Sequence, residues 1–195
     1  AMTHVILQEY YENQPNDMFI NYAKQYSDMP FVIMLDEDEN GYKAGRFLRA
    51  SDLGMSGENN EWKPVIQDKL SQQLLVPNGT MGQRWEEGKK WNLKLETEDG
   101  TPIDPMLSMA ESDYHVETIQ FPYFDSSGDG IFERPIATRT IQLANGEKVK
   151  IATVYDLMTS QYGVQRFEHE LEATSYDDAS SKYTPAWQEQ ITGIK

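Results

Sequence analysis

Five Asn-Gly or Asp-Gly pairs interrupt the middle of this 195-residue chain: Asn40-Gly41, Asn78-Gly79, Asp99-Gly100, Asp129-Gly130 and Asn145-Gly146. Asparagine or aspartate followed by glycine favours the left-handed backbone of a tight turn. The apolar runs between these pairs are short, as they are in strands. Residues 31–152 are therefore predicted to form a β-rich region of hairpins.

The clearest hairpin covers residues 138–154, "TRTIQLANGEKVKIATV". A two-residue loop would place Ile141 opposite Lys150, whereas a three-residue loop over 144–146 places Ile141 opposite Val149. The second register is predicted, with Gly146 in the left-handed bulge position. This register gathers four apolar side chains on one face: Ile141, Leu143, Val149 and Ile151.

Other short segments are also predicted to be strands. Residues 31–50 should form two strands around an acidic turn, and residues 115–124 should form one strand. The pattern of residues 104–115 fits both a helical turn and a loop. Three further short strands are predicted between long connections, at 62–68, 72–77 and 90–99.

The two ends of the chain are predicted to be helical. Residues 3–11 and 16–30 carry apolar side chains at helical spacing. Thr153 and Asp156 suit a capping box for a helix over 154–162 that ends at Gly163, and Thr184 with Pro185 begins a last helix that Gly193 stops. The buried stripe of the 154–162 helix is predicted to be Val154, Leu157, Met158 and Tyr162.

These patterns predict an α+β fold in which a β-rich central insertion with hairpins is flanked by helices at both ends. The chain is treated as one unit, with a helical host segment at 1–30, the insertion at 31–152 and a helical return segment at 153–195. An insertion cut out with pieces of its host domain should expose an apolar patch near both chain ends, and these ends should lie close together.

Charge and composition exclude several classes of function. The chain has 32 acidic and 17 basic side chains, a formal charge of −15, so a nucleic-acid partner is not expected. It has no cysteine, which excludes thiolate catalysis, cysteine-ligated clusters and disulfides within the chain. No apolar run is long enough to cross a bilayer, so no direct membrane insertion is predicted. The first residues carry no basic leader, so no signal peptide is expected.

The loop "FDSSGDGIFERP" has the start of a calcium-binding pattern. Asp125, Ser127 and Asp129 occupy the first, third and fifth places, and a glycine follows at the sixth. The twelfth place is Ile136 instead of a bidentate glutamate, and Glu133 at the ninth place is a weaker ligand. The loop is predicted to be an exposed, mobile turn without an ion, with a calcium-binding module as the alternative.

No other metal or catalytic motif stands out. The three histidines, at positions 4, 115 and 169, lack ligand spacing, and His4 is predicted to be structural. Four tryptophans and the acidic clusters at 35–39 and 176–178 leave a carbohydrate-binding or glycosidase domain as a further alternative. The tryptophans are Trp62, Trp85, Trp91 and Trp187.

Several stretches in order, "NYAKQYSDMPFVIML", "GYKAGRFLRASDLG", "ENNEWK", "PNGTMGQRW", "KKWNLKL", "QFPYF", "VYDLMTSQYGV", "ATSYDD" and "YTPAWQEQITGI", resemble one protein family. That family is the catalytic alpha subunit of the membrane-bound respiratory nitrate reductases, within the molybdopterin oxidoreductase (DMSO reductase) superfamily. "AGRFLRASDL", "PNGTMGQRW" and "ATSYDD" point to the nitrate reductase branch. The resemblance covers nearly the whole chain.

The resemblance implies that this chain is an internal fragment of a much longer subunit, one that reduces nitrate to nitrite in anaerobic respiration. The parent would hold molybdenum in bis-molybdopterin guanine dinucleotide and an Fe–S cluster. Its partners would be an electron-transferring Fe–S beta subunit and a membrane subunit, at the cytoplasmic side of a bacterial membrane. The family's catalytic residues lie outside the matching stretch, so the fragment is predicted to be inactive and to hold no cofactor. It would form either a wall of the substrate entrance or a surface for the electron-transferring subunit.

One loop is predicted to make contacts in the parent protein. Thr174, Ser175, Tyr176 and Asp177 lie in the "ATSYDD" match, and polar loops often carry binding. The loop is interpreted either as a contact to the cofactor or as packing against the parent domain, and the second interpretation is favoured.

Overall fold

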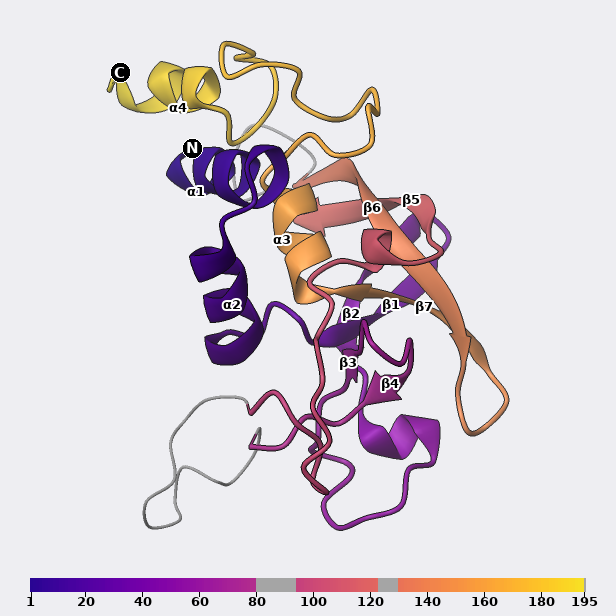
Figure 1. Ribbon diagram of the computed structural model, residues 1–195. Coiled ribbons are helices and arrows are strands. Elements are labelled where there is room, and N and C mark those ends of the chain that lie inside the picture. The colour runs from indigo at the N-terminus through magenta and orange to yellow at the C-terminus, as the bar shows by residue number, and fades with distance from the viewer. Residues whose placement is uncertain (80–93, 123–129, 195) are drawn as a thin grey trace.

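A five-stranded closed barrel forms the centre of the chain in the computed structural model, which describes residues 1–79, 94–122 and 130–194 (Figure 1). Neighbouring strands follow the order β1 (Val32–Asp38), β2 (Gly41–Phe47), β5 (His115–Pro122), β6 (Ile131–Gln142) and β7 (Lys148–Thr153). β2 pairs with β5 in parallel, and every other pairing in the barrel is antiparallel. The predicted α+β fold, with a β-rich centre and helices at the ends, is confirmed.

The β6–β7 hairpin has the predicted register. Ile141 lies opposite Val149, and the Leu143 N–H donates to the Glu147 carbonyl at 2.8 Å across the mouth of a three-residue loop. Gly146 has φ +88°, a left-handed conformation that suits glycine. The register therefore follows from the apolar alternation together with the Asn-Gly pair.

Short elements cover one end of the barrel. They are η2 (Ala50–Leu53), η4 (Met109–Glu111) and a two-stranded sheet of β3 (Ile66–Gln67) and β4 (Leu74–Leu75). The predicted strand over 90–99 is wrong in its described part, 94–99, where Glu96 makes a single bridge to Pro102. A local turn competes there: the Thr97 N–H donates to the Thr101 carbonyl at 2.8 Å, around Gly100 at φ +84°.

Four helical segments lie at the two ends of the chain. α1 (Met2–Leu7) continues into a π-helical stretch, η1 (Gln8–Asn13), and α2 (Asp17–Tyr26) begins where the Asn16 side chain accepts the Met18 N–H at 3.0 Å. α3 (Val154–Gln161) begins at Thr153, which forms the predicted capping box with Asp156. α4 (Pro185–Thr192) begins at Thr184 and ends at Gly193, as predicted. Within the described ranges, no helix has both the length and the apolar character to cross a membrane.

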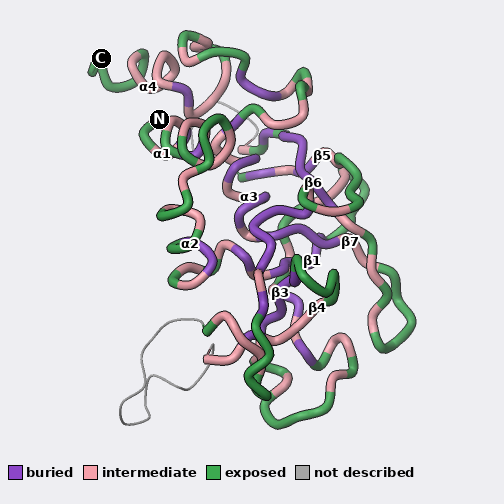
Figure 2. The backbone as a smooth tube through the Cα atoms, viewed as in Figure 1, coloured by how far each residue is buried: buried purple, intermediate pink, exposed green. Residues whose placement is uncertain are grey.

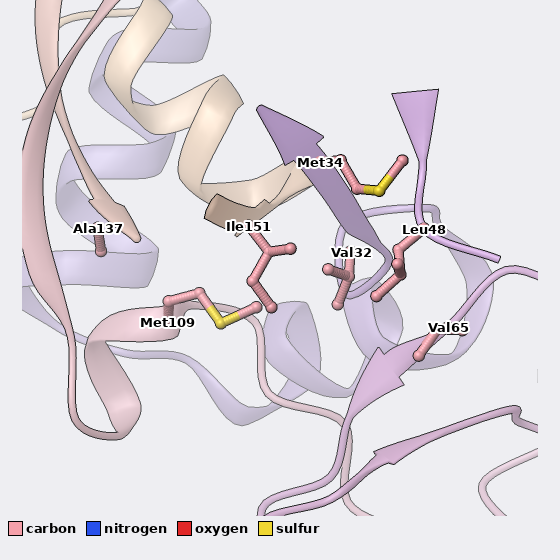
Figure 3. Close-up of a cluster of buried hydrophobic side chains, with 7 residues drawn as sticks. All are labelled: Val32, Met34, Leu48, Val65, Met109, Ala137 and Ile151. Carbon is pink, nitrogen blue, oxygen red and sulfur yellow. The ribbon is translucent and has the colours of Figure 1, made fainter. Parts of the chain in front are cut away.

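Both faces of the central strands are buried. Along β1, Val32 and Met34 join a cluster with Ile151, which Figure 3 shows. Leu35 joins a second cluster with Ile136. The first cluster also takes Ala137 from β6, and Leu48, Val65 and Met109 from segments outside the barrel strands. Figure 2 shows this concentration of buried backbone around β1, β6 and β7. The barrel therefore has apolar packing on both sides of its sheet.

α3 buries a different face from the predicted one. Its buried residues are Tyr155, Asp156, Thr159 and Ser160, while Val154, Leu157 and Met158 of the predicted stripe are only half-buried. The Ser160 hydroxyl donates to the Pro135 carbonyl at 2.7 Å. The short helix lies between the barrel and a polar cluster, and its buried Tyr155 joins an apolar cluster with Leu7 and Leu107. Hydrogen bonds and packing to distant segments therefore set its orientation together.

Candidate contact site at the helical end

A buried guanidinium, that of Arg166, joins segments far apart in the sequence. Its Nη1 lies 2.9 Å from the Asp156 carboxylate, its Nε lies 3.1 Å from the Glu12 carboxylate, and its Nη2 donates to the Ser108 hydroxyl at 2.6 Å. The side chain is 6% exposed. Burial opposes its charge, but the two carboxylates outweigh burial and hold the pKa of Arg166 above its ordinary value. We call these four residues the Arg166 network.

Asp156 connects this network to the barrel. Its carboxylate accepts the Ser108 hydroxyl at 2.6 Å and the Met109 N–H at 2.9 Å. The same carboxylate lies 2.9 Å from the hydroxyl of Thr153, which is the last residue of β7. Asp156 is fully buried, so each of these contacts compensates its loss of water.

Glu172 shapes the segment that leads to the predicted contact loop. Its buried carboxylate accepts the backbone N–H groups of Arg166 at 2.9 Å, of Phe167 at 3.1 Å and of His169 at 3.0 Å. A carboxylate that accepts three N–H groups closes residues 166–172 into a compact loop. The charged sequence "FEHELE" in this stretch gave no signal of this role, because such runs usually mark a solvated surface.

The predicted contact loop, residues 174–177, is anchored through Tyr176. The Tyr176 hydroxyl donates to the Glu9 carboxylate, and its ring meets the His4 ring edge to face at 5.7 Å between centroids. Its carbonyl accepts the Ala186 N–H of α4 at 3.1 Å. Burial and the Glu9 carboxylate raise the pKa of Tyr176 to about 12. The loop thus links α1, η1 and α4.

A polar pocket of about 300 Å³ lies between α1, η1 and this loop. Three of the four predicted residues, Thr174, Ser175 and Tyr176, line it, whereas Asp177 is exposed beside it. The helices contribute His4, Gln8, Glu9 and Asn13 to the lining. Sequence reasoning missed these helical residues, because only the fold brings the first and last fifths of the chain together.

The calcium-loop residues Asp125, Ser127 and Asp129 lie outside the described residues. Ile136, at the twelfth place of that pattern, is fully buried in β6, and Glu133 is exposed on the same strand. Across residues 1–79, 94–122 and 130–194, no three His, Cys, Asp or Glu side chains are grouped to hold a metal ion.

The tryptophans give no support to a carbohydrate-binding row among the residues that the structure describes. Trp62 is 59% exposed, and its carbonyl accepts a hydrogen bond from Arg49 at 2.8 Å. Trp187 lies on α4 and packs against Tyr183 at 5.4 Å between ring centroids. Trp85 and Trp91 lie outside the described residues.

Comparison with known proteins identifies relatives over the whole chain, although no protein-family profile matches it. The nitrate reductase alpha chain of Bacillus subtilis is 46% identical over 196 residues. The respiratory nitrate reductase 1 alpha chain of Escherichia coli K12 is 39% identical over 208 residues, and the nitrate reductase alpha subunit of Mycobacterium tuberculosis H37Rv is 37% identical over 202. The resemblance seen in the sequence motifs is confirmed. In each case the match covers 100% of this chain and 16% of the relative's length.

Proposed function

We propose that this chain, which is related over its whole length to nitrate reductase alpha chains, is a non-catalytic segment that helps to shape such a subunit. The whole-length identity of 35–46% to proteins of that name carries the proposal. According to this proposal, the complete protein reduces nitrate to nitrite in anaerobic respiration, at the cytoplasmic side of a bacterial membrane. The segment on its own is expected to reduce no nitrate.

The proposal assigns cofactor binding to the remainder of the subunit. An Fe–S cluster needs cysteine ligands, and this chain has no cysteine. The proposal therefore places the cluster and the bis-molybdopterin guanine dinucleotide with molybdenum in the remainder of the subunit, and no catalytic step is assigned to this chain.

An exposed apolar surface on the first helices suits contact with the rest of the subunit. Two rows of exposed apolar side chains at i, i+4, i+8 spacing form it, one on α1 and η1 and one on α2. Tyr10 of the first row also packs on Phe19 of α2 at 5.4 Å between ring centroids. Large exposed apolar patches of this kind usually mark interaction surfaces. We call these rows the apolar helical face: Met2, Ile6 and Tyr10 on α1 and η1, and Met18, Tyr22 and Tyr26 on α2.

The C-terminal end of the chain also exposes apolar side chains. Ile191 and Ile194, at and just after the end of α4, are 61% and 69% exposed. Figure 1 shows both termini at the same end of the molecule, as expected for a segment that leaves and re-enters a larger domain. We propose that the remainder of the alpha subunit covers this end, and that the contact loop 174–177 packs against it. The beta and membrane subunits join the complex beyond that contact.

The test uses a complete alpha subunit that contains this segment. Tyr22→Glu with Tyr26→Glu places two charges on the apolar helical face, so we expect loss of assembled enzyme by size-exclusion chromatography and a matching loss of viologen-dependent nitrate reduction. Leu70→Glu is the matched control, because Leu70 is 68% exposed in the turn between β3 and β4. Normal assembly of the double variant would contradict the proposed contact.

A further inference from the structure

The polar pocket between α1, η1 and the loop at 173–176 presents hydrogen-bond acceptors that the described residues leave unused. We propose that this pocket binds a guanidinium group, such as the end of an arginine side chain. The inference is independent of the proposed function, because it rests only on this chain's own pocket.

His4 supplies one acceptor. Its Nδ1 lies 2.7 Å from the Tyr162 carbonyl, and a carbonyl can only accept, so Nδ1 carries the proton. The other ring nitrogen, Nε2, is then an acceptor, and it has no hydrogen-bond partner among the described residues. The side chain is 98% buried, since only 2% is exposed, yet it lines the pocket. Burial lowers the pKa of His4 and so favours this neutral form.

Glu9 supplies a charged acceptor on the same wall. One carboxylate oxygen, Oε1, accepts the Tyr176 hydroxyl, and the second has no hydrogen-bond partner in the part of the chain that the structure describes. The raised pKa of Tyr176, from burial and from this carboxylate, keeps the phenol a donor. Glu9 thus lines the pocket with its carboxylate held in place through Oε1.

The described residues give the pocket no positive group of its own. None of those that line it is a lysine or an arginine. The Gln8 amide is already used, because its Nε2 donates to Asn13 at 3.0 Å and its Oε1 accepts the Gln165 N–H at 2.9 Å. The cationic groups that act on His4 are the Ala1 amino group and Arg134, and neither lines the pocket.

These features favour a planar cation with several donors. A guanidinium has five N–H groups in a fixed plane and can reach acceptors on more than one wall, whereas an ammonium is a compact point charge. His4 and Glu9 line the pocket from the helical side, and Thr174 and Ser175 line it from the loop side. The Ser175 hydroxyl also accepts the Asp177 N–H at 3.1 Å. The volume of about 300 Å³ accommodates the end of one side chain.

The experiment is an NMR titration of the isotope-labelled 195-residue chain with N-acetyl-arginine N-methylamide. We expect saturable shifts at the His4 ring nitrogens and at the Thr174 and Ser175 amides. Glu9→Gln should weaken binding about tenfold, because a charge-assisted hydrogen bond is lost. Glu39→Gln, in the exposed β1–β2 turn, should leave the affinity unchanged.

Further arms separate the ligand classes. The matching lysine derivative should bind at least about fivefold more weakly, and equal binding would overturn the guanidinium assignment. Tighter binding of the capped derivative than of free L-arginine would assign the site to a protein side chain, and the reverse would assign it to a free guanidinium compound; both outcomes support the site.

If Glu9→Gln disturbs the circular dichroism spectrum, Thr174→Val replaces it. Non-saturable shifts spread over the acidic surface and unchanged by these variants would refute the proposal, while leaving the assembly test unaffected.

Discussion

Ile151 on β7 and Ile191 on α4 are both isoleucines, but their surroundings are opposite. Ile151 is fully buried, and Ile191 is 61% exposed. The regions around them differ in the same way. The barrel packs apolar side chains on both faces of its strands, whereas α4 buries no residue at all. Figure 2 shows the contrast between the buried strands and the more exposed helical end.

This difference teaches that two kinds of stabilisation operate in one chain. The barrel is stabilised by apolar burial, which needs no further partner. The helical end combines a smaller apolar cluster around Leu7, Ala23 and Tyr155 with polar anchors. These anchors are the Arg166 network, the contact of His4 with Tyr162 and the bond of Tyr176 to Glu9. The exposed apolar side chains of its helices remain available for another surface.

The largest effect is expected at the junction of the two regions. Arg166→Ala should lower the free energy of unfolding by about 4 kcal/mol, because it leaves the fully buried Asp156 carboxylate without its cation. Urea denaturation, followed by circular dichroism, measures this free energy of unfolding. Arg166→Ala combined with Asp156→Asn should recover part of the loss, since the amide carries no buried charge and its oxygen can still accept the Met109 N–H. A loss below about 1 kcal/mol in Arg166→Ala would show that the network does not join the regions.

A matched pair of substitutions tests the comparison directly. Ile151→Ala should cost about 3 kcal/mol through a cavity in the barrel core, whereas Ile191→Ala should change stability by less than about 0.5 kcal/mol. Both are measured by urea denaturation under identical conditions. Similar costs for the two variants would mean that α4 is packed as firmly as the barrel.

A smaller, local effect is expected at the start of α4. The Thr184 hydroxyl accepts the Trp187 N–H at 3.2 Å, so Thr184→Ala should cost about 1 kcal/mol. Because the helix has little buried surface, the loss should appear as faster hydrogen exchange of amides 186–192. Amides of β6 and β7 should keep their rates, and equal acceleration there would contradict independent opening of the helical end.

The smallest effect concerns alkaline pH. The pKa of Tyr176 is raised to about 12, against about 10 for an unfolded tyrosine. The folded state therefore holds this proton more tightly, so the stabilisation is complete below pH 10 and is lost as the pH rises towards 12. Tyr176→Phe should show a shallower fall in stability across this window by urea denaturation. Tyr26→Phe, which removes an exposed phenol, is the control and should keep the wild-type slope.

Local features of the sequence were sufficient to predict several elements. The caps at Thr153 and Thr184, the stop at Gly193 and the register of Ile141 opposite Val149 all depend on residues within a few positions of one another. Short-range sterics and hydrogen bonds decide such features, so a single sequence contains the information.

The features that prediction missed depend on distant partners. The buried face of α3 is polar because Asp156 meets Ser108 and Arg166, which come from other segments. Apolar spacing alone pointed to Leu157 and Met158 instead. The polar pocket is similar, since His4 and Thr174 meet only after the chain has folded. The sequence match drew attention to the loop at 174–177 but gave no sign of Glu9, which lines the same pocket.

The pairing that closes the barrel has a consequence for the order of events during synthesis. β1 is hydrogen-bonded to β7, with Val32 opposite Thr153, so the two strands are separated by about 120 residues of chain. Pairings between such distant segments form late and slowly. On the ribosome, the β1–β2 hairpin must wait with one edge open until β7 has emerged from the exit tunnel. During that interval the exposed edge is open to wrong pairing, which makes this stage of translation the point where a chaperone would be most useful.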